Sequence, residues 1–134
     1  MKTTASAQEQ FKNDLFATKV TGIVIEEAHD GYAKCKLETT AQHMNAVGSV
    51  MGGVIFTLAD FTFAVASNTE DELVVSMTSQ ITYLSHPRSS ILYAESSCIK
   101  EGKRTCSYII TVSDSLQTVV ASVSVTGMRL PNKS

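Results

Sequence analysis

Asp60 is the residue whose surroundings call for a chemical explanation. It is the only charged residue between positions 51 and 67, in a stretch that is apolar nearly all round. No lysine or arginine occurs between Lys36 and Arg88, so no local cation is available to pair with it. Burial raises the pKa of such a carboxyl group and makes the carboxylate more basic, as is typical of functional sites. The alternative is a structural aspartate that reaches solvent or a sheet edge, or accepts a hydrogen bond from Thr57 or another element.

Two glycines, Gly52 and Gly53, open the same stretch. In a helix that begins there, the first N–H groups are unpaired and carry a partial positive charge. Glycines leave room for a ligand atom to approach the backbone, so the pair could polarise a carbonyl group or hold an oxyanion. The alternative is that another element passes close to the helix at this point.

The spacing of Gly52 and Asp60 bears on the number of chains in the site. Eight residues of helix correspond to about 12 Å along its axis. A carbonyl group held at the helix N-terminus cannot also lie about 3 Å from Asp60 of the same chain, the distance needed for attack. If both residues act on one bond, they come from two chains, and the site lies at a dimer interface.

Basic residues gather late in the chain. Arg88 lies in a turn, and a predicted hairpin around Gly102 contains Lys100, Lys103 and Arg104. A local cationic patch on a protein with a net charge of -2 suits a phosphate-bearing ligand. The alternative is a solvated hairpin tip.

The pattern of the chain indicates which elements must position these residues. Ser6, with Glu9 three residues later, is typical of a helix N-cap. Alternating and β-branched residues predict strands, and residues 39–50 indicate a loop. The expected elements are a helix over 6–18, strands over 19–29 and 32–38, a buried helix over 51–67, and strands over 75–83, 91–100, 104–112 and 118–127. This order predicts an α+β fold, in which one long antiparallel sheet wraps around one central apolar helix.

A family resemblance lies in segment 43–54, HMNAVGSVMGGV, followed by the Leu-Ala-Asp that ends at Asp60. It resembles the signature of hotdog-fold acyl-CoA thioesterases of the PaaI and 4-hydroxybenzoyl-CoA thioesterase type. The family pattern reads H-x-N-x-x-G-x-x-H-G-G, then L-x-D. Segment 75–84 is similar to the family's third strand, and the Gly-Lys pair at 102 to its hairpin turn. The chain departs from the family at Met51, which stands where a histidine usually precedes the two glycines.

The resemblance implies a role for each residue that matches the motif. Asp60 would be the nucleophile or the general base that activates water, and Gly52 would present its backbone N–H from the other subunit. Asn45 would orient the water or the thioester, and Ser76 would help to place water or substrate. The residues that it assigns to substrate binding, several of them at the family's coenzyme A contacts, are Met51, Gly53, Thr78, Tyr83, Arg88, Gly102, Lys103 and Arg104.

We therefore expect an enzyme that hydrolyses a small aromatic or medium-chain acyl-CoA to the free acid and coenzyme A. It needs no cofactor and no metal, and it forms a homodimer or a dimer of dimers. Methionine cannot donate a hydrogen bond or carry charge, so Met51 keeps a non-catalytic acyl-CoA-binding dimer as the alternative. A partner in a larger assembly, with a structural Asp60, is a further alternative. A hydratase is more remote, because the Asp and His pair expected for hydration is not visible as a motif.

Length and composition bound these expectations. The chain has 134 residues, of which 43% are hydrophobic and 18% charged, which predicts a single globular domain over 1–134 with residues 1–5 frayed. The acidic balance argues against nucleic acid as a partner, and the absence of a signal peptide or an apolar span predicts a cytoplasmic protein away from membranes. The three cysteines are expected to be structural. A two-residue turn would place Cys98 and Cys106 on opposite faces of the hairpin.

Overall fold

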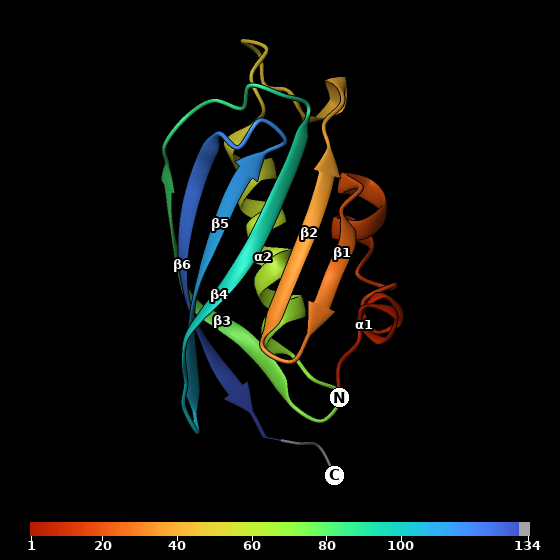
Figure 1. The fold of residues 1–134 in the computed structure, drawn as a ribbon, viewed down its shortest axis with the longest axis vertical. Helices are drawn as coiled ribbons and strands as arrows, with labels where there is room; N and C mark the ends of the chain where they lie inside the picture. Colours follow the sequence, from red (N-terminus) through yellow and green to blue (C-terminus); the bar gives the residue numbers. More distant parts are fainter. Residues whose placement is uncertain (132–134) are drawn as a thin grey trace.

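The computed structural model describes residues 1–131, which form a six-stranded antiparallel sheet curled around a long helix (Figure 1). The strands are hydrogen-bonded in the order β1-β2-β4-β5-β6-β3, so β1 and β3 are the two edges. The bounds are α1 (Thr4–Gln10), β1 (Val24–His29), β2 (Tyr32–Glu38), α2 (Gly52–Ser67), β3 (Leu73–Tyr83), β4 (Ile91–Glu101), β5 (Thr105–Asp114) and β6 (Val119–Leu130), with a π-helix over Phe16–Thr21 and a short 3-10 helix over Ala41–His43. No helix in this part of the chain is long and apolar enough to cross a membrane.

Helix α2 packs against the concave face of the sheet because most of its surface is apolar. Leu58 and Phe63 are fully buried, and Phe63 meets Tyr108 of β5 edge to face, with 5.6 Å between the ring centroids. Gly127 of β6 allows this close approach, since a Cβ atom there would lie 2.7 Å from the Phe63 ring. The expectation of a sheet wrapped around one apolar helix is confirmed.

The N-terminus differs from the expected frayed segment over 1–5. Lys2 is only 7% exposed, and its ammonium group donates to the carbonyl oxygens of Val65 and Ala66, at the end of α2 where the helix dipole favours a cation. Thr3, not Ser6, is the N-cap of α1, and the two residues form a reciprocal capping box. Local sequence patterns could not predict the burial of Lys2, because its acceptors lie more than 60 residues later in the sequence.

The segment before β1 also differs from expectation. Residues 16–21 form a π-helix in place of the predicted beginning of a strand at residue 19. The carbonyl oxygen of Thr21 accepts a hydrogen bond from His43 Nε2 at 2.7 Å, and Gly22 ends the helix with φ at 91°, a left-handed conformation that favours glycine. These tertiary and backbone constraints outweigh the β-branched residues of the segment, so β1 starts only at Val24.

The two edges of the sheet are unlike each other. The outer edge of β1 is covered by α1, because Gln8 Nε2 donates to the carbonyl oxygen of Ile25 at 3.0 Å and Thr4 Oγ1 accepts from the N–H of Ala28 at 3.1 Å. β3 pairs with β6 on one side, and no strand of residues 1–131 pairs with its other side. An exposed strand edge of this kind is a surface for pairing with another chain.

Cys98 and Cys106 lie on the same face of the β4–β5 hairpin, so the expectation of opposite faces is wrong. The register pairs Cys98 with Tyr108 and Glu101 with Cys106, and residues paired in this way share a face. A bulge between Cys98 and Lys100 inserts one residue and reverses the alternation that the sequence predicts. Both thiols are free; Cys106 is buried and Cys98 is exposed.

Candidate active site

Asp60 lies in the middle of α2, on the stripe that the sheet leaves partly exposed. Gly53, Thr57 and Ala64 share this stripe at spacings of three and four residues. Desolvation by the surrounding protein, and then the negative charge of Asp14, raise the pKa of Asp60. Thr57 does not satisfy the carboxylate, because its hydroxyl donates to the carbonyl oxygen of Gly53 at 2.7 Å. No hydrogen bond or ion pair among residues 1–131 involves the Asp60 side chain, which leaves it available to a ligand.

Asp14 is a second acidic residue of this region, and the sequence patterns did not point to it. Phe11 meets Phe61, the neighbour of Asp60 in α2, edge to face with 5.7 Å between the ring centroids. The N–H of Asp14 donates to the carbonyl oxygen of Phe11 at 3.0 Å. The segment before the π-helix is thereby anchored beside the middle of α2, and it brings Asp14 close enough to act on Asp60 electrostatically. This proximity depends on tertiary packing alone.

The N-terminus of α2 is open. Met51 is the N-cap, in an extended conformation, and its side chain makes no capping hydrogen bond. Its backbone N–H donates to the carbonyl oxygen of His43 at 2.9 Å, which fixes the approach to the helix. The N–H groups of Gly52 and Gly53 come first in the helix and have no carbonyl one turn earlier to accept them. They are donors suited to an oxygen that gains negative charge.

The two glycines at this helix end have different surroundings. The hydroxyl of Tyr83 donates to the carbonyl oxygen of Gly52 at 2.8 Å, and a Cβ atom on Gly52 would lie 2.8 Å from that hydroxyl oxygen. Close passage of another element, here the end of β3, therefore explains glycine at position 52. A Cβ atom on Gly53 would meet only the end of the Met51 side chain, at 3.9 Å, so this position is open to a ligand.

Two adjoining clefts lie above this helix end, between loop 43–50 and loop 84–90. One, of about 380 Å³, is lined by residues that include Asn45, Gly52 and Tyr83. The other, of about 340 Å³, includes Arg88. They share a wall formed by Ser49, Val50, His86 and Pro87. His86 is a polar residue of this wall that no sequence motif indicates.

Asn45 shapes the first cleft from within loop 43–50. Its side-chain oxygen accepts the N–H groups of Val47 at 3.1 Å and Ser49 at 3.0 Å. Asn45 thus holds the loop in shape, and it also lines the cleft beside Gly52. Its assignment to the orientation of water or thioester stays a prediction.

Ser76 and Thr78 lie elsewhere, on the open edge strand β3. They face Gly127 and Thr126 of β6 across a bulge, and both are exposed. Neither lines the two clefts above α2. The structure of one chain therefore does not bring them to Gly52, and their roles in placing water and substrate stay predictions.

The expected cationic patch does not form within one chain. Arg88 lies just before β4 and hairpin residues 102–104 just after it, so the 11 residues of the strand separate them, by roughly 36 Å at 3.3 Å per residue. Figure 1 shows these two loops at opposite ends of the sheet. The charge near the hairpin is also mixed, because Arg129 pairs with Glu101 and donates to the carbonyl oxygen of Gly102. Within one chain Arg88 and the hairpin residues do not form one patch, and their assignment to coenzyme A binding stays a prediction.

Asp114 fixes the loop that carries Arg88, and no sequence pattern indicated it. It is 2% exposed, and one carboxylate oxygen accepts the N–H groups of Arg88 at 2.6 Å and Ser89 at 3.2 Å. The other accepts those of Leu116 at 3.0 Å and Thr118 at 2.9 Å. Desolvation opposes ionisation, but the hydrogen bonds from Arg88, Thr118 and Leu116 outweigh it and lower the pKa of Asp114. The carboxylate ties loop 84–90 to the β5–β6 turn.

We expect Asp114→Asn to lower the thermal midpoint at neutral pH by several degrees. An amide has a single acceptor oxygen, so two of the four N–H groups lose their partner. Because folding lowers the pKa of Asp114, its contribution to stability is present above the pKa of the unfolded chain and is lost as the pH falls through the folded value. Thermal denaturation of both proteins across acidic and neutral pH checks this, and an equal gap at all pH values would contradict it.

Comparison with known proteins places this arrangement in a family. The family model described as the thioesterase superfamily matches residues 47–121, which include α2 and most of the sheet. The chain belongs to the thioesterase superfamily. It is 32% identical over 117 residues to the acyl-coenzyme A thioesterase PaaI of Escherichia coli strain K12, covering 87% of this chain and 83% of that protein.

Solved structures agree with this thioesterase assignment. The PaaI protein of the E. coli phenylacetic acid degradation operon has a TM-score of 0.89 at 29% identity, over 96% of this chain and 94% of that one. A Streptococcus mutans protein bound to acetyl CoA shares the fold, with a TM-score of 0.77 at 24% identity over 84% and 91% of the two chains. The expected hotdog fold and the expected thioester hydrolase are confirmed.

Proposed function

We propose that this thioesterase hydrolyses an acyl-CoA with a small aromatic or medium-chain acyl group, in a site shared by two subunits. The observation that carries the proposal is the Asp60 carboxylate, which has a raised pKa, no partner among residues 1–131 and a place on the uncovered stripe of α2. Leu15 and Phe16, which directly follow Asp14 in the sequence, are apolar and exposed, which suits an apolar acyl group. The acyl-CoA thioesterase PaaI, a relative at 32% identity, supports the same class of substrate.

The geometry of α2 supports a site built from two chains. The helix is continuous from Gly52 to Ser67, so about 12 Å of helix axis separates Gly52 from Asp60. One thioester carbonyl cannot contact both the N–H of Gly52 and the carboxylate of Asp60 within a single chain. A second copy paired along the open edge of β3 would supply the missing half. A dimer, with a dimer of dimers as the larger state, is therefore part of the proposal.

The reaction follows from these groups. The thioester oxygen is held by the N–H of Gly52 of the partner subunit, and Asp60 takes a proton from the water that attacks the carbonyl carbon. The C–O bond forms, negative charge passes to the held oxygen, and collapse breaks the C–S bond. The thiolate of coenzyme A leaves and regains the proton, and the acid is released. If Asp60 instead attacks the carbon directly, a mixed anhydride forms, and water then hydrolyses it to the same products.

The test is thiol release from a panel of aromatic and aliphatic acyl-CoAs, with binding of the same compounds measured by calorimetry. Turnover that is fastest with one acyl class supports the proposal and defines that class. Binding without thiol release would favour the alternative of a non-catalytic acyl-CoA binder, for which Met51 in place of the histidine is the motivating feature. If the protein shows no binding and no thiol release with any compound of the panel, acyl-CoA is rejected as the ligand.

The raised pKa of Asp60 predicts the pH dependence of kcat/KM. Both routes need the ionised carboxylate, so kcat/KM should rise with pH and level off above an apparent pKa higher than the ordinary carboxyl value of about 4. Asp14→Asn removes one of the two causes of the shift and should move the rise to lower pH. Rate profiles of both proteins check this, and a variant that rises at the same pH as the wild type would contradict it.

A further inference from the structure

Tyr83 makes two contacts with the same backbone unit at the start of α2. It is the last residue of β3, and its hydroxyl donates to the carbonyl oxygen of Gly52 at 2.8 Å. Its ring lies over the same glycine, since a Cβ atom on Gly52 would be 3.0 Å from ring atom Cζ and 3.3 Å from Cε1. Tyr83 is nevertheless 52% exposed and lines the cleft beside Gly52.

These contacts fall on the Gly52–Gly53 peptide, which directly follows the N–H of Gly52 proposed to hold the thioester oxygen. The carbonyl of Gly52 and the N–H of Gly53 belong to one planar peptide unit, and a hydrogen bond to the carbonyl polarises that N–H and fixes the orientation of the plane. The N-cap Met51 contributes no side-chain hydrogen bond. Tyr83 therefore adds a side-chain restraint from outside the helix to the Gly52–Gly53 peptide, which the N-cap side chain does not supply.

We propose that Tyr83 is a positioning residue of the thioesterase: it fixes the Gly52–Gly53 peptide, which sets the direction of the Gly53 N–H and, through the Gly52 Cα, restrains the Gly52 N–H that is aimed at the thioester oxygen. The inference rests on the proposed function and deepens it. It replaces the role that the family resemblance implies for Tyr83, which is contact with coenzyme A. The hydroxyl is committed to Gly52, and its effect reaches the substrate only through the backbone.

The two possible roles of Tyr83, positioning and coenzyme contact, predict different changes in kcat and KM when the thiol of the substrate is varied. A positioning residue acts on the transition state whatever thiol leaves, so its loss lowers kcat. A coenzyme contact acts through the nucleotide or the pantetheine arm, so its loss raises KM only for the complete coenzyme ester. The same acyl group carried on coenzyme A and on the short thiol N-acetylcysteamine separates them.

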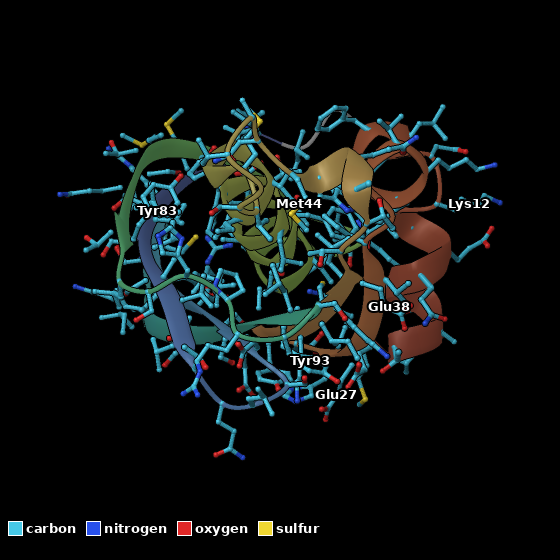
Figure 2. All side chains as sticks on the ribbon, turned by 90° about the horizontal axis from the view of Figure 1, so that it is seen from above. Lys12, Glu27, Glu38, Met44, Tyr83 and Tyr93 are labelled. Carbon is cyan, nitrogen blue, oxygen red and sulfur yellow. The ribbon has the colours of Figure 1, made fainter. Side chains whose placement is uncertain are left out.

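The experiment compares Tyr83→Phe with the wild type on both esters. We expect kcat to fall about three- to tenfold with each ester, the worth of one hydrogen bond, while KM changes less than about twofold. Tyr93→Phe is the matched control, because Tyr93 lies on β4 under the ammonium group of Lys34, on the convex side of the sheet away from α2 (Figure 2). This control should leave kcat and KM unchanged with both esters.

A second measurement tests the Tyr83–Gly52 contact without activity. Gly52→Ala should lower the thermal midpoint, because the new Cβ atom meets the tyrosine ring and hydroxyl. Adding Tyr83→Ala removes the ring and hydroxyl that the new Cβ atom meets. The stability loss of the double variant should therefore be smaller than the sum of the losses of the two single variants. Strict additivity, or Gly52→Ala as stable as the wild type, would overturn the inference.

The kinetic outcomes separate the inference from the proposed function. An unchanged kcat in Tyr83→Phe, or an effect confined to KM for the coenzyme ester, overturns the positioning role while leaving acyl-CoA hydrolysis intact. A wild type that hydrolyses neither ester, or turnover independent of Asp60, rejects the proposed function and the inference with it. A fall in kcat that is shared by Tyr93→Phe would also count against a specific role.

Discussion

Asp60→Asn should fold like the wild type and lose at least about a thousandfold in kcat with every acyl-CoA that the wild type hydrolyses. An amide can neither accept the proton from water nor attack the carbonyl carbon, so both routes through Asp60 stop. The change is nearly isosteric and removes no hydrogen bond of the described chain, because none among residues 1–131 involves this carboxylate. Thiol release by the two proteins at matched concentrations measures the effect.

Stability separates a functional Asp60 from a structural one. Folding raises the pKa of Asp60, so the ionised carboxylate is disfavoured in the folded protein, and this cost is present at neutral pH and disappears as the pH falls below the unfolded value. Asp60→Asn should therefore have a thermal midpoint equal to or above that of the wild type. Asp71→Asn, an exposed change beyond the end of α2, is the matched control and should keep full turnover. Wild-type turnover in Asp60→Asn would refute the assignment.

Much of the fold could be predicted because local sequence patterns indicate its central helix and most of its strands. The central helix was expected over 51–67 and is observed over Gly52–Ser67, and the strand expected over 32–38 is observed over Tyr32–Glu38. A helix that must be apolar nearly all round and strands that alternate are both visible in the sequence. The same patterns located Asp60, since a lone charge in such a helix is conspicuous without knowledge of any contact.

Features set by tertiary contacts could not be predicted. Lys2 is buried because two carbonyl oxygens at the end of α2 accept its ammonium group, and Asp114 depends on backbone N–H groups from a loop some 25 residues earlier. The bulge after Cys98 leaves no mark in the sequence but moves its side chain to the face of Cys106. Asp14 likewise reaches the region of Asp60 through the packing of Phe11 on Phe61.

Met77→Lys should convert the protein to a folded monomer and reduce turnover at least about a hundredfold, if the site takes Asp60 from one chain and Gly52 from another. Met77 lies at the bulge of β3, the edge strand that no strand of residues 1–131 covers, and it is 56% exposed in the single chain. Lysine on an edge strand opposes pairing with another strand, and a two-fold interface brings two such charges together. Sedimentation gives the oligomeric state, circular dichroism the fold, and thiol release the activity.

Val24→Lys is the matched control for this prediction because the opposite edge of the sheet is already closed. Val24 is 57% exposed on β1, so the same change is made at equal exposure on an edge strand. Side chains of α1 occupy the backbone groups of that edge, and strand pairing there is blocked before any lysine is added. The control should remain oligomeric and active. A monomeric Met77→Lys with wild-type turnover would show that one chain contains a complete site. Gly52 and Asp60, about 12 Å apart along α2, would then not both act on the same thioester bond.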